Sequence, residues 1–267
     1  MTAVATPDTR EFLGIDFSAI SHDEVVSALA RVEPETSYFY VVTPNVDHVV
    51  RLAGEQERGD PLHLTSVYKN AGLRLCDSRV LSRLASLNGV SLPVVTGSDL
   101  TKRIFDSILR AKDSVAVIGG DDSSIEALKS MYPQIRIQHH SPPMGLLANA
   151  RAMSAAADYA AASGARFIFF AVGSPQQELL AAELAARGSL GGCALCIGAS
   201  IDFIVGRERR APRWVQRLGF EWSYRLLKSP RRMWRRYMVE GPRVLPAVWR
   251  WRRARGKSLI DSSRIET

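Results

Sequence analysis

The chain has 267 residues, of which 46% are hydrophobic and 23% are charged. This length is enough to bury a full core, in one large domain or two small ones, and it excludes a peptide hormone or a small disulfide scaffold. The composition is that of an ordinary globular protein, so it also excludes wholesale disorder, collagen and heptad-repeat proteins.

The formal net charge of +8 is distributed unevenly along the chain. Residues 207–267 hold 18 of the 35 Lys and Arg but only 5 of the 27 Asp and Glu, a net charge of +13, and they hold all five tryptophans. Residues 1–206 therefore carry a net charge of −5. A basic, aromatic tail of this kind binds anionic partners, either nucleic acid or the headgroups of a membrane surface.

Short β-branched or aromatic runs alternate with longer amphipathic segments, a pattern that predicts an α/β fold with a largely parallel sheet. We expect a flexible amino terminus over residues 1–11, the α/β body over 12–206 and a separate appendage over 207–267. Strands are predicted at residues 38–43, 91–95, 114–118, 166–172 and 194–197. Helices are predicted at residues 99–111, 123–131, 149–163 and 175–187, with short tail helices at 214–227 and 230–238 that Pro230, Pro242 and Pro246 limit in length.

The three cysteines indicate no disulfide framework and no metal site. Cys193 and Cys196 lie in an apolar run with no second Cys pair and no nearby histidine, so we interpret them as residues of a buried strand. The five histidines show no ligand spacing with carboxylates, and we expect no metal ion. The amino terminus lacks the pattern of a signal peptide, and no apolar run of about 18 residues is present, so we expect a cytoplasmic protein without a membrane span.

Glycines follow three of the predicted strands, at Gly119, Gly173 and Gly198, where ligands bind in open α/β sheets. The Gly119-Gly120 pair leads from a strand into a helix and suits a diphosphate, although a purely structural turn is an equal alternative. Gly173 precedes Ser174-Pro175, and we expect Pro175 at the first helical position after a Ser cap. The following Gln176 and Gln177 would then project toward a ligand; the alternative is a well-capped surface helix.

Polar side chains at other strand ends are candidates for catalysis and binding. Asn45, after Thr43 and Pro44, is a candidate substrate-positioning amide. Asp77 is either a general base or the cap of the helix from Arg79 onward. Asp202 lies among apolar neighbours, where an unpaired carboxylate would be costly, so it either caps a loop or contacts a ligand hydroxyl or imide.

These motifs, in this order, resemble the WecG/TagA/CpsF glycosyltransferase family, glycosyltransferase family 26. The resemblance covers nearly the whole chain. It rests on Thr43-Pro44-Asn45, Asp77, Thr96-Gly97-Ser98-Asp99-Leu100, Gly119-Gly120, Tyr132-Pro133, Gly173 with Pro175 and Gln177-Glu178, Gly198, Asp202-Phe203, Arg210-Ala211-Pro212-Arg213-Trp214, Phe220-Glu221-Trp222-Ser223-Tyr224-Arg225 and Pro230-Arg231-Arg232.

The resemblance implies a Rossmann-like fold of the GT-E type and an inverting, metal-independent transferase that needs no cofactor. Its partners would be a UDP-sugar donor, a saccharide linked to undecaprenyl diphosphate, and the anionic inner face of the plasma membrane; a homo-oligomer is left open. The family's catalytic base falls on Asp77, its Thr-x-Asn pair on Thr43 and Asn45, its active-site glutamine on Gln177 and its nucleotide-contacting aspartate on Asp202.

The tail from Arg207 onward matches the family's membrane-docking appendage, and Arg210 and Arg213 are candidates to contact the diphosphate. Three departures limit the transfer of these roles. Ser78 follows Asp77 where the family usually has Gly, and many members carry Arg near the position of Val94. In the loop before Asn149, the segment His139-His140-Ser141-Pro142-Pro143-Met144-Gly145 replaces the family's common Gly-aromatic pattern. This variant looks like branches that build exopolysaccharide or capsule repeats rather than those that add N-acetylmannosamine, so the donor sugar is left open. The alternative functions are a nucleic-acid-binding protein, whose tail tryptophans would stack on bases, and an oxidoreductase, whose Gly-x-Gly-x-x-Gly fingerprint is missing.

Overall fold

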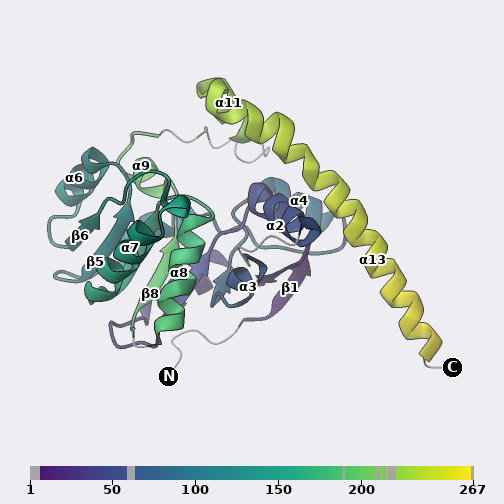
Figure 1. Cartoon of the computed structure of the whole chain (residues 1–267), viewed down its shortest axis with the longest axis horizontal. Helices are drawn as coiled ribbons and strands as arrows, with labels where there is room; N and C mark the ends of the chain where they lie inside the picture. Colours follow the sequence, from purple (N-terminus) through teal and green to yellow (C-terminus); the bar gives the residue numbers. More distant parts are fainter. Residues whose placement is uncertain are drawn as a thin grey trace.

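A six-stranded, all-parallel sheet with strand order β4-β3-β8-β7-β5-β6 forms the centre of the molecule (Figure 1). The structure is a computed structural model that describes residues 7–58, 64–188, 190–208, 211–212, 215 and 221–265. The strands are β3 (Phe39–Val42), β4 (Leu73–Arg74), β5 (Ser114–Gly119), β6 (Arg136–His140), β7 (Phe167–Ala171) and β8 (Cys193–Cys196). The predicted α/β fold with a parallel sheet is confirmed.

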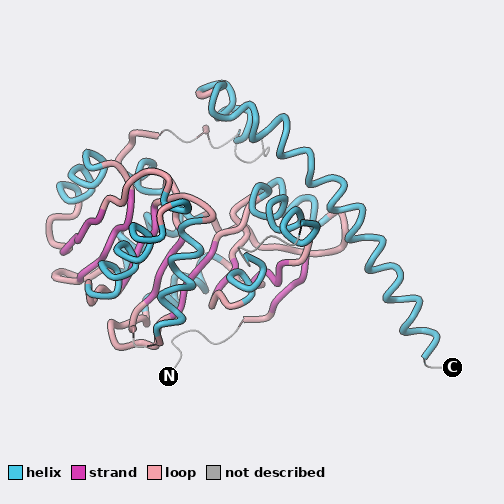
Figure 2. Tube along the Cα trace, viewed as in Figure 1, coloured by secondary structure: helices cyan, strands magenta, loops and turns pink. Residues whose placement is uncertain are grey.

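Helices cover both faces of the sheet, so the body has three layers (Figure 2). Side chains of β5 alternate between two cores, with Ala116 and Ile118 in one and Val115 and Val117 in the other. The first core packs against α2 (Val46–Arg58), α3 (Leu64–Lys69), α4 (Arg79–Ser86), η2 (Leu146–Ala148), α7 (Ala150–Ala162) and α8 (Gln176–Arg187). The second packs against α1 (His22–Ala30), α5 (Gly97–Arg103), η1 (Ile104–Ile108), α6 (Asp122–Met131) and α9 (Ser200–Ile204).

One predicted strand, over residues 91–95, is wrong. This segment forms only an isolated bridge, in which Val94 pairs with Cys76. Pro93 interrupts it, and a proline has no N–H group to donate to a strand ladder. The helix predicted over 99–111 begins earlier, at Gly97, because Thr96 accepts a hydrogen bond from the Asp99 backbone N–H and caps it there.

The amino-terminal segment is ordered over part of the range that we expected to be flexible. Strands β1 (Thr9–Phe12) and β2 (Ile15–Ser18) form an antiparallel hairpin. Its turn residues, Leu13 and Gly14, both have positive φ, and Leu-Gly lacks the Asn or Asp that usually marks such a turn. Residues 9–12 of the terminus that we expected to be flexible therefore form a strand, and the ordered body begins before residue 12.

The tail forms a chain of helices that returns to the body and then runs past it (Figure 1). Val244, Ala247 and Val248 are buried in the first core, and the indole Nε1 of Trp251 donates to Glu11 of β1 at 2.8 Å. The tail elements are α11 (Glu221–Lys228), α12 (Pro230–Trp234), η3 (Arg235–Glu240), η4 (Gly241–Arg243) and α13 (Val244–Ile265). The first two turns of α13 thus belong to the body, which the division at residue 207 did not anticipate.

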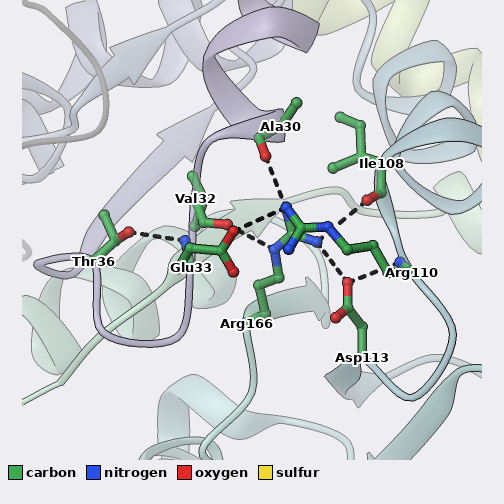
Figure 3. Close-up of polar contacts among 8 residues, drawn as sticks. All are labelled: Ala30, Val32, Glu33, Thr36, Ile108, Arg110, Asp113 and Arg166. Carbon is green, nitrogen blue, oxygen red and sulfur yellow. Dashed lines mark hydrogen bonds and ion pairs between the residues drawn. The ribbon is translucent and has the colours of Figure 1, made fainter.

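A buried arginine ties the elements together at the amino-terminal end of the sheet (Figure 3). Arg166, 1% exposed, precedes β7 and pairs with Asp113, with Nη1 and Oδ2 2.5 Å apart. Arg166 also donates to the carbonyls of Ala30, the last residue of α1, of Val32, which follows α1, and of Ile108, the last residue of η1. These bonds compensate the desolvated charge and fix two helix ends to the sheet, opposite the strand ends that hold the candidate site.

Candidate active site

A cavity of about 620 Å³ lies at the carboxyl ends of strands β3, β4, β7 and β8. In parallel sheets these ends are where loops and helix amino termini form ligand sites. The body contributes residues from the loop after each strand and from the start of α5. Among these residues are Thr43, Asn45, His48, Arg51, Asp77, Arg79, Thr96, Ser98, Gly173, Ser174, Gln177, Ile197, Gly198 and Ser200.

Thr43 and Asn45 are fixed by hydrogen bonds at the carboxyl end of β3. The Thr43 hydroxyl donates to the carbonyl of Cys196 at 3.2 Å, which ties β3 to β8. The side-chain oxygen of Asn45 accepts from the Asp47 backbone N–H at 3.0 Å, and the backbone N–H of Asn45 donates to Nδ1 of His48 at 3.2 Å. Asn45 therefore caps α2 with its oxygen, and its NH₂ group is the part of the amide left to contact a substrate.

Asp77 lies in the loop that joins β4 to α4. Its backbone N–H donates to the carbonyl of Pro44 at 3.0 Å, so this loop is held against the Thr43-Pro44-Asn45 segment. The helix begins at Arg79, and its cap is Ser78, whose hydroxyl accepts from the Leu81 N–H. The helix-cap alternative for Asp77 is therefore wrong, since the neighbouring serine takes that role.

Gln177 lines the cavity from the first turn of α8, and its amide is oriented at both ends. The side-chain oxygen accepts from the backbone N–H of Gly198 at 3.0 Å, and Nε2 donates to Oε1 of Glu178 at 2.8 Å. Glu178 is fully buried, and this burial raises the pKa of its carboxyl group. These two bonds hold the amide in one orientation and leave the second N–H of Nε2 without a hydrogen bond among the described residues.

The predicted positions of Ser174 and Pro175 at the start of α8 are wrong. The helix begins at Gln176, and Pro175 occupies the N-cap position rather than the first helical position. Ser174 does not cap the helix; its hydroxyl accepts a hydrogen bond from Nη1 of Arg51 at 2.6 Å. The loop after β7 is thus bonded to α2, which places an arginine on the cavity wall.

The tail completes the wall of the cavity. Arg79 and Glu221 form an ion pair across 2.9 Å, and this pair joins the segment after Asp77 to α11. The tail residues that line the cavity are Ala211, Glu221, Trp222, Met238, Gly241 and Val244. Residues of both the body and the tail therefore line the cavity.

The thiol of Cys76, the residue before Asp77, is not suited to act as a nucleophile. Burial raises the pKa of the Cys76 thiol to about 12, so it stays protonated and is a poor nucleophile. Within the part of the chain that the structure describes, no group of three or more His, Cys, Asp or Glu is placed to hold a metal ion.

Residues 10–258 match the model of the glycosyl transferase WecG/TagA/CpsF family. The chain belongs to this family. A relative in Bacillus spizizenii, named N-acetylglucosaminyldiphosphoundecaprenol N-acetyl-beta-D-mannosaminyltransferase, is 32% identical over 167 residues. The alignment covers 61% of this chain and 62% of the relative, so the chain spans less than two thirds of the relative's length.

In this member of the WecG/TagA/CpsF family, the cavity brings together five of the predicted site residues. Thr43, Asn45, Asp77, Gly173 and Gln177 all line it, although they come from the loops after β3, β4 and β7 and from the first turn of α8. Gly173 has φ of +79°, in the left-handed region that favours glycine, with no other atom within 4 Å of where a Cβ would lie.

Gly119 and Gly120 lie at the end of β5 and do not line the cavity. A Cβ on Gly119 would lie 2.6 Å from Cγ1 of Val172 and 3.0 Å from backbone atoms of Ala171, so close approach of β5 and β7 explains this glycine. Gly120 has φ of +86°, which a turn into α6 requires. A purely structural role, the alternative named above, therefore explains the presence of both glycines without a bound ligand.

Asp202 also lies outside the cavity lining, in the first turn of α9. Its Oδ1 accepts from the Ser124 hydroxyl at 2.7 Å, and Arg207 donates to the same hydroxyl at 2.9 Å. Arg207 also pairs with Asp121, whose pKa falls to about 2 because of hydrogen bonds from Ser123 and Arg207. Asp202 is thus part of a polar cluster that joins α6, α9 and the start of the tail.

Two further predicted residues, Arg210 and Arg213, lie outside the described residues. The sequence interpretation missed Arg51, Arg79 and Glu221, which line the cavity. Arg51 lies three residues after His48, which in turn lies three after Asn45. A helical spacing of this kind places all three near one face of α2, and it could have identified Arg51.

Proposed function

We propose that this chain is an inverting, metal-independent glycosyltransferase that moves a sugar from a UDP-sugar to a saccharide linked to polyprenyl diphosphate. The process served would be the synthesis of a bacterial surface polysaccharide such as exopolysaccharide or capsule. The observation that carries the proposal is the cavity that Asp77 lines together with Thr43, Asn45 and Gln177. Family membership and the relative's printed acceptor, a diphosphoundecaprenol-linked sugar, support it.

Inversion requires a single displacement at the anomeric carbon. A hydroxyl oxygen of the acceptor attacks this carbon, the bond to the UDP oxygen breaks, and the bonding electrons leave with UDP. Asp77 would take the proton of the attacking hydroxyl as general base. The NH₂ groups of Asn45 and Gln177, oriented by their hydrogen bonds, would position the sugars.

The departing UDP gains negative charge, so the site must offset it. Arg210 and Arg213 of the tail remain our candidates for this role, and Gly173 would allow close approach of the donor. We further propose that the carboxylate of Asp202, which accepts a hydrogen bond from the Ser124 hydroxyl, contacts the nucleoside of the bound donor.

Association with the inner face of the plasma membrane is part of the proposal. The tail exposes large apolar side chains among its arginines, including Leu227, Trp234, Leu245 and Trp249. Interfacial tryptophans and basic residues hold proteins on anionic bilayers. None of the described helices combines the length and hydropathy needed to cross a membrane.

The decisive experiment incubates the full chain with a panel of UDP-sugars and a GlcNAc-diphosphate-polyprenol acceptor, and analyses the lipid product by mass spectrometry. One UDP-sugar should extend the acceptor by one sugar, with the anomeric configuration inverted by NMR. A chelator should leave the rate unchanged. Absence of transfer from every UDP-sugar tested, or an activity that chelation removes and magnesium or manganese restores, would contradict the proposal.

A further inference from the structure

Two arginines line the described part of the cavity, and they differ in how their charge is balanced. Arg79 forms an ion pair with Glu221 at 2.9 Å. Arg51 forms no ion pair with any carboxylate among the described residues; its Nη1 donates to the uncharged hydroxyl of Ser174 at 2.6 Å. Among the described residues, no carboxylate therefore neutralises the charge of Arg51 at contact distance.

The position of Arg51 places this charge between two loops of the site. Arg51 belongs to α2, the helix that Asn45 caps, while Ser174 follows Gly173 in the loop before α8. The guanidinium thus lies where the β3 and β7 loops meet, and its side chain is only partly exposed. The bond to Ser174 uses one of five N–H donors and fixes the orientation of the group.

The neighbouring acidic residue, Glu178, is hydrogen-bonded to Gln177 rather than ion-paired with Arg51. Glu178 is fully buried behind the cavity wall, where Nε2 of Gln177 donates to its Oε1. The burial of this carboxyl group disfavours its ionised form, although the positive charge of Arg51 acts in the opposite direction. A partly exposed guanidinium that has no carboxylate partner in the described part of the chain is suited to an anionic ligand, since its planar donors match phosphate and carboxylate oxygens.

We propose that Arg51 is a binding residue for the donor, and that it pairs with an anionic oxygen of the nucleotide sugar. Two groups of the donor offer this chemistry: the diphosphate, and the carboxylate of a donor whose sugar is a uronic acid. This inference rests on the proposed function, because it assumes a UDP-sugar in the cavity. In this proposal a positive charge that binds the donor lies in the body, whereas the sequence interpretation placed such charges in the tail.

The test measures ligand binding by calorimetry on the full chain and on Arg51→Gln and Arg51→Lys. The ligands are uridine, UMP, UDP, UDP-glucose and UDP-glucuronic acid. Arg110→Gln is the control, because Arg110 is an exposed arginine that pairs with Glu33 away from the cavity. The melting temperature of each variant establishes that it is folded.

If Arg51 contacts the diphosphate, Arg51→Gln should weaken UDP binding by about tenfold to a hundredfold and leave uridine binding unchanged, and Arg51→Lys should restore part of the loss. If Arg51 contacts a sugar carboxylate, UDP binding should stay constant while the preference for UDP-glucuronic acid over UDP-glucose falls by a similar factor. The control should bind all ligands like the unmodified chain.

Unchanged affinity of a folded Arg51→Gln variant for all five ligands would overturn the inference while leaving the proposed function intact. A change confined to the Michaelis constant of the lipid acceptor would overturn it as well. Failure of the unmodified chain to bind any uridine nucleotide would overturn the proposed function, and the role of Arg51 with it.

Discussion

The backbone N–H of Asp77 donates a hydrogen bond to the carbonyl oxygen of Pro44 across 3.0 Å. Pro44 lies between Thr43 and Asn45, so this bond holds the loop of the candidate base against the two polar residues at the end of β3. Since the loops are attached to neighbouring parallel strands, the rigid sheet determines their spacing. A general base needs such fixed placement relative to the hydroxyl that it deprotonates.

Replacement of Gln177 by Ala should reduce turnover more than it reduces nucleotide binding. The amide is held between Gly198 and Glu178, and we place its remaining N–H near the transferred sugar. We expect kcat to fall by at least about tenfold while the dissociation constant of UDP changes less than about threefold. Steady-state kinetics and calorimetry check this, and a loss confined to UDP binding would show that Gln177 contacts the nucleotide instead.

The sequence predicted the parts of the fold that local patterns determine. Strands β3, β5, β7 and β8 are short apolar runs, and they were identified. Strand β6 has the polar sequence RIQHH, and β4 has only two residues, so neither shows a buried-strand pattern. The length of α13 was also missed, since Pro246 was interpreted as a limit although a proline is tolerated in the first turn of a helix.

For the candidate site too, local sequence patterns predict some of the residues, while contacts between distant segments could not be predicted. Thr43, Asn45, Asp77 and Gln177 follow strands or begin helices, so the rule for parallel sheets predicts that they converge. The pairing of Arg79 with Glu221 joins residues 142 positions apart, and the packing of Trp251 on Phe12 joins the two ends of the chain. No local pattern predicts such contacts, because they depend on where the tail returns to the body.

Replacement of Asp202 by Ala should weaken UDP binding, as we place this carboxylate on the nucleoside. The matched variant is Ser124→Ala, which removes the hydroxyl that donates to Asp202 but keeps the carboxylate. We expect a loss of UDP affinity of about tenfold for Asp202→Ala and a smaller loss for Ser124→Ala. Equal UDP affinity in the unmodified chain and in Asp202→Ala, measured by calorimetry, would assign Asp202 a structural role only.

The tail should hold the protein on anionic bilayers through its exposed tryptophans. Trp234 is 60% exposed and Trp249 is 53% exposed. The double variant Trp234→Ala, Trp249→Ala should lower partitioning onto phosphatidylglycerol vesicles by about tenfold or more, because each indole loses apolar contact with the interface. Turnover of a water-soluble acceptor should be retained.

The control for this measurement is Met131→Ala, which removes an exposed apolar side chain from α6 of the body. Substitutions are preferable to deletion of the tail, because Val244, Ala247 and Val248 form part of the core. Undiminished vesicle binding by the double variant would show that these indoles are not the anchor.

Replacement of Asp113 by Ala should destabilise the fold without affecting the site directly. The change leaves the buried Arg166 without its carboxylate partner, at the end of the sheet opposite the cavity. Removal of one member of a buried pair costs about 3 kcal/mol or more. Urea denaturation should show a lower midpoint, while Lys129→Gln, which breaks an exposed pair with Glu126, should change the free energy of unfolding by less than about 1 kcal/mol. Equal midpoints for the two variants would contradict this role of the pair.

The most direct test of the proposed mechanism is the kcat of Asp77→Asn at saturating donor and acceptor. The amide keeps the shape of the side chain but cannot accept the proton of the acceptor hydroxyl. We predict normal folding, unchanged UDP affinity and a kcat reduced by about 100-fold to 10,000-fold. A folded Asp77→Asn variant with a kcat close to that of the unmodified chain would show that Asp77 is not the base.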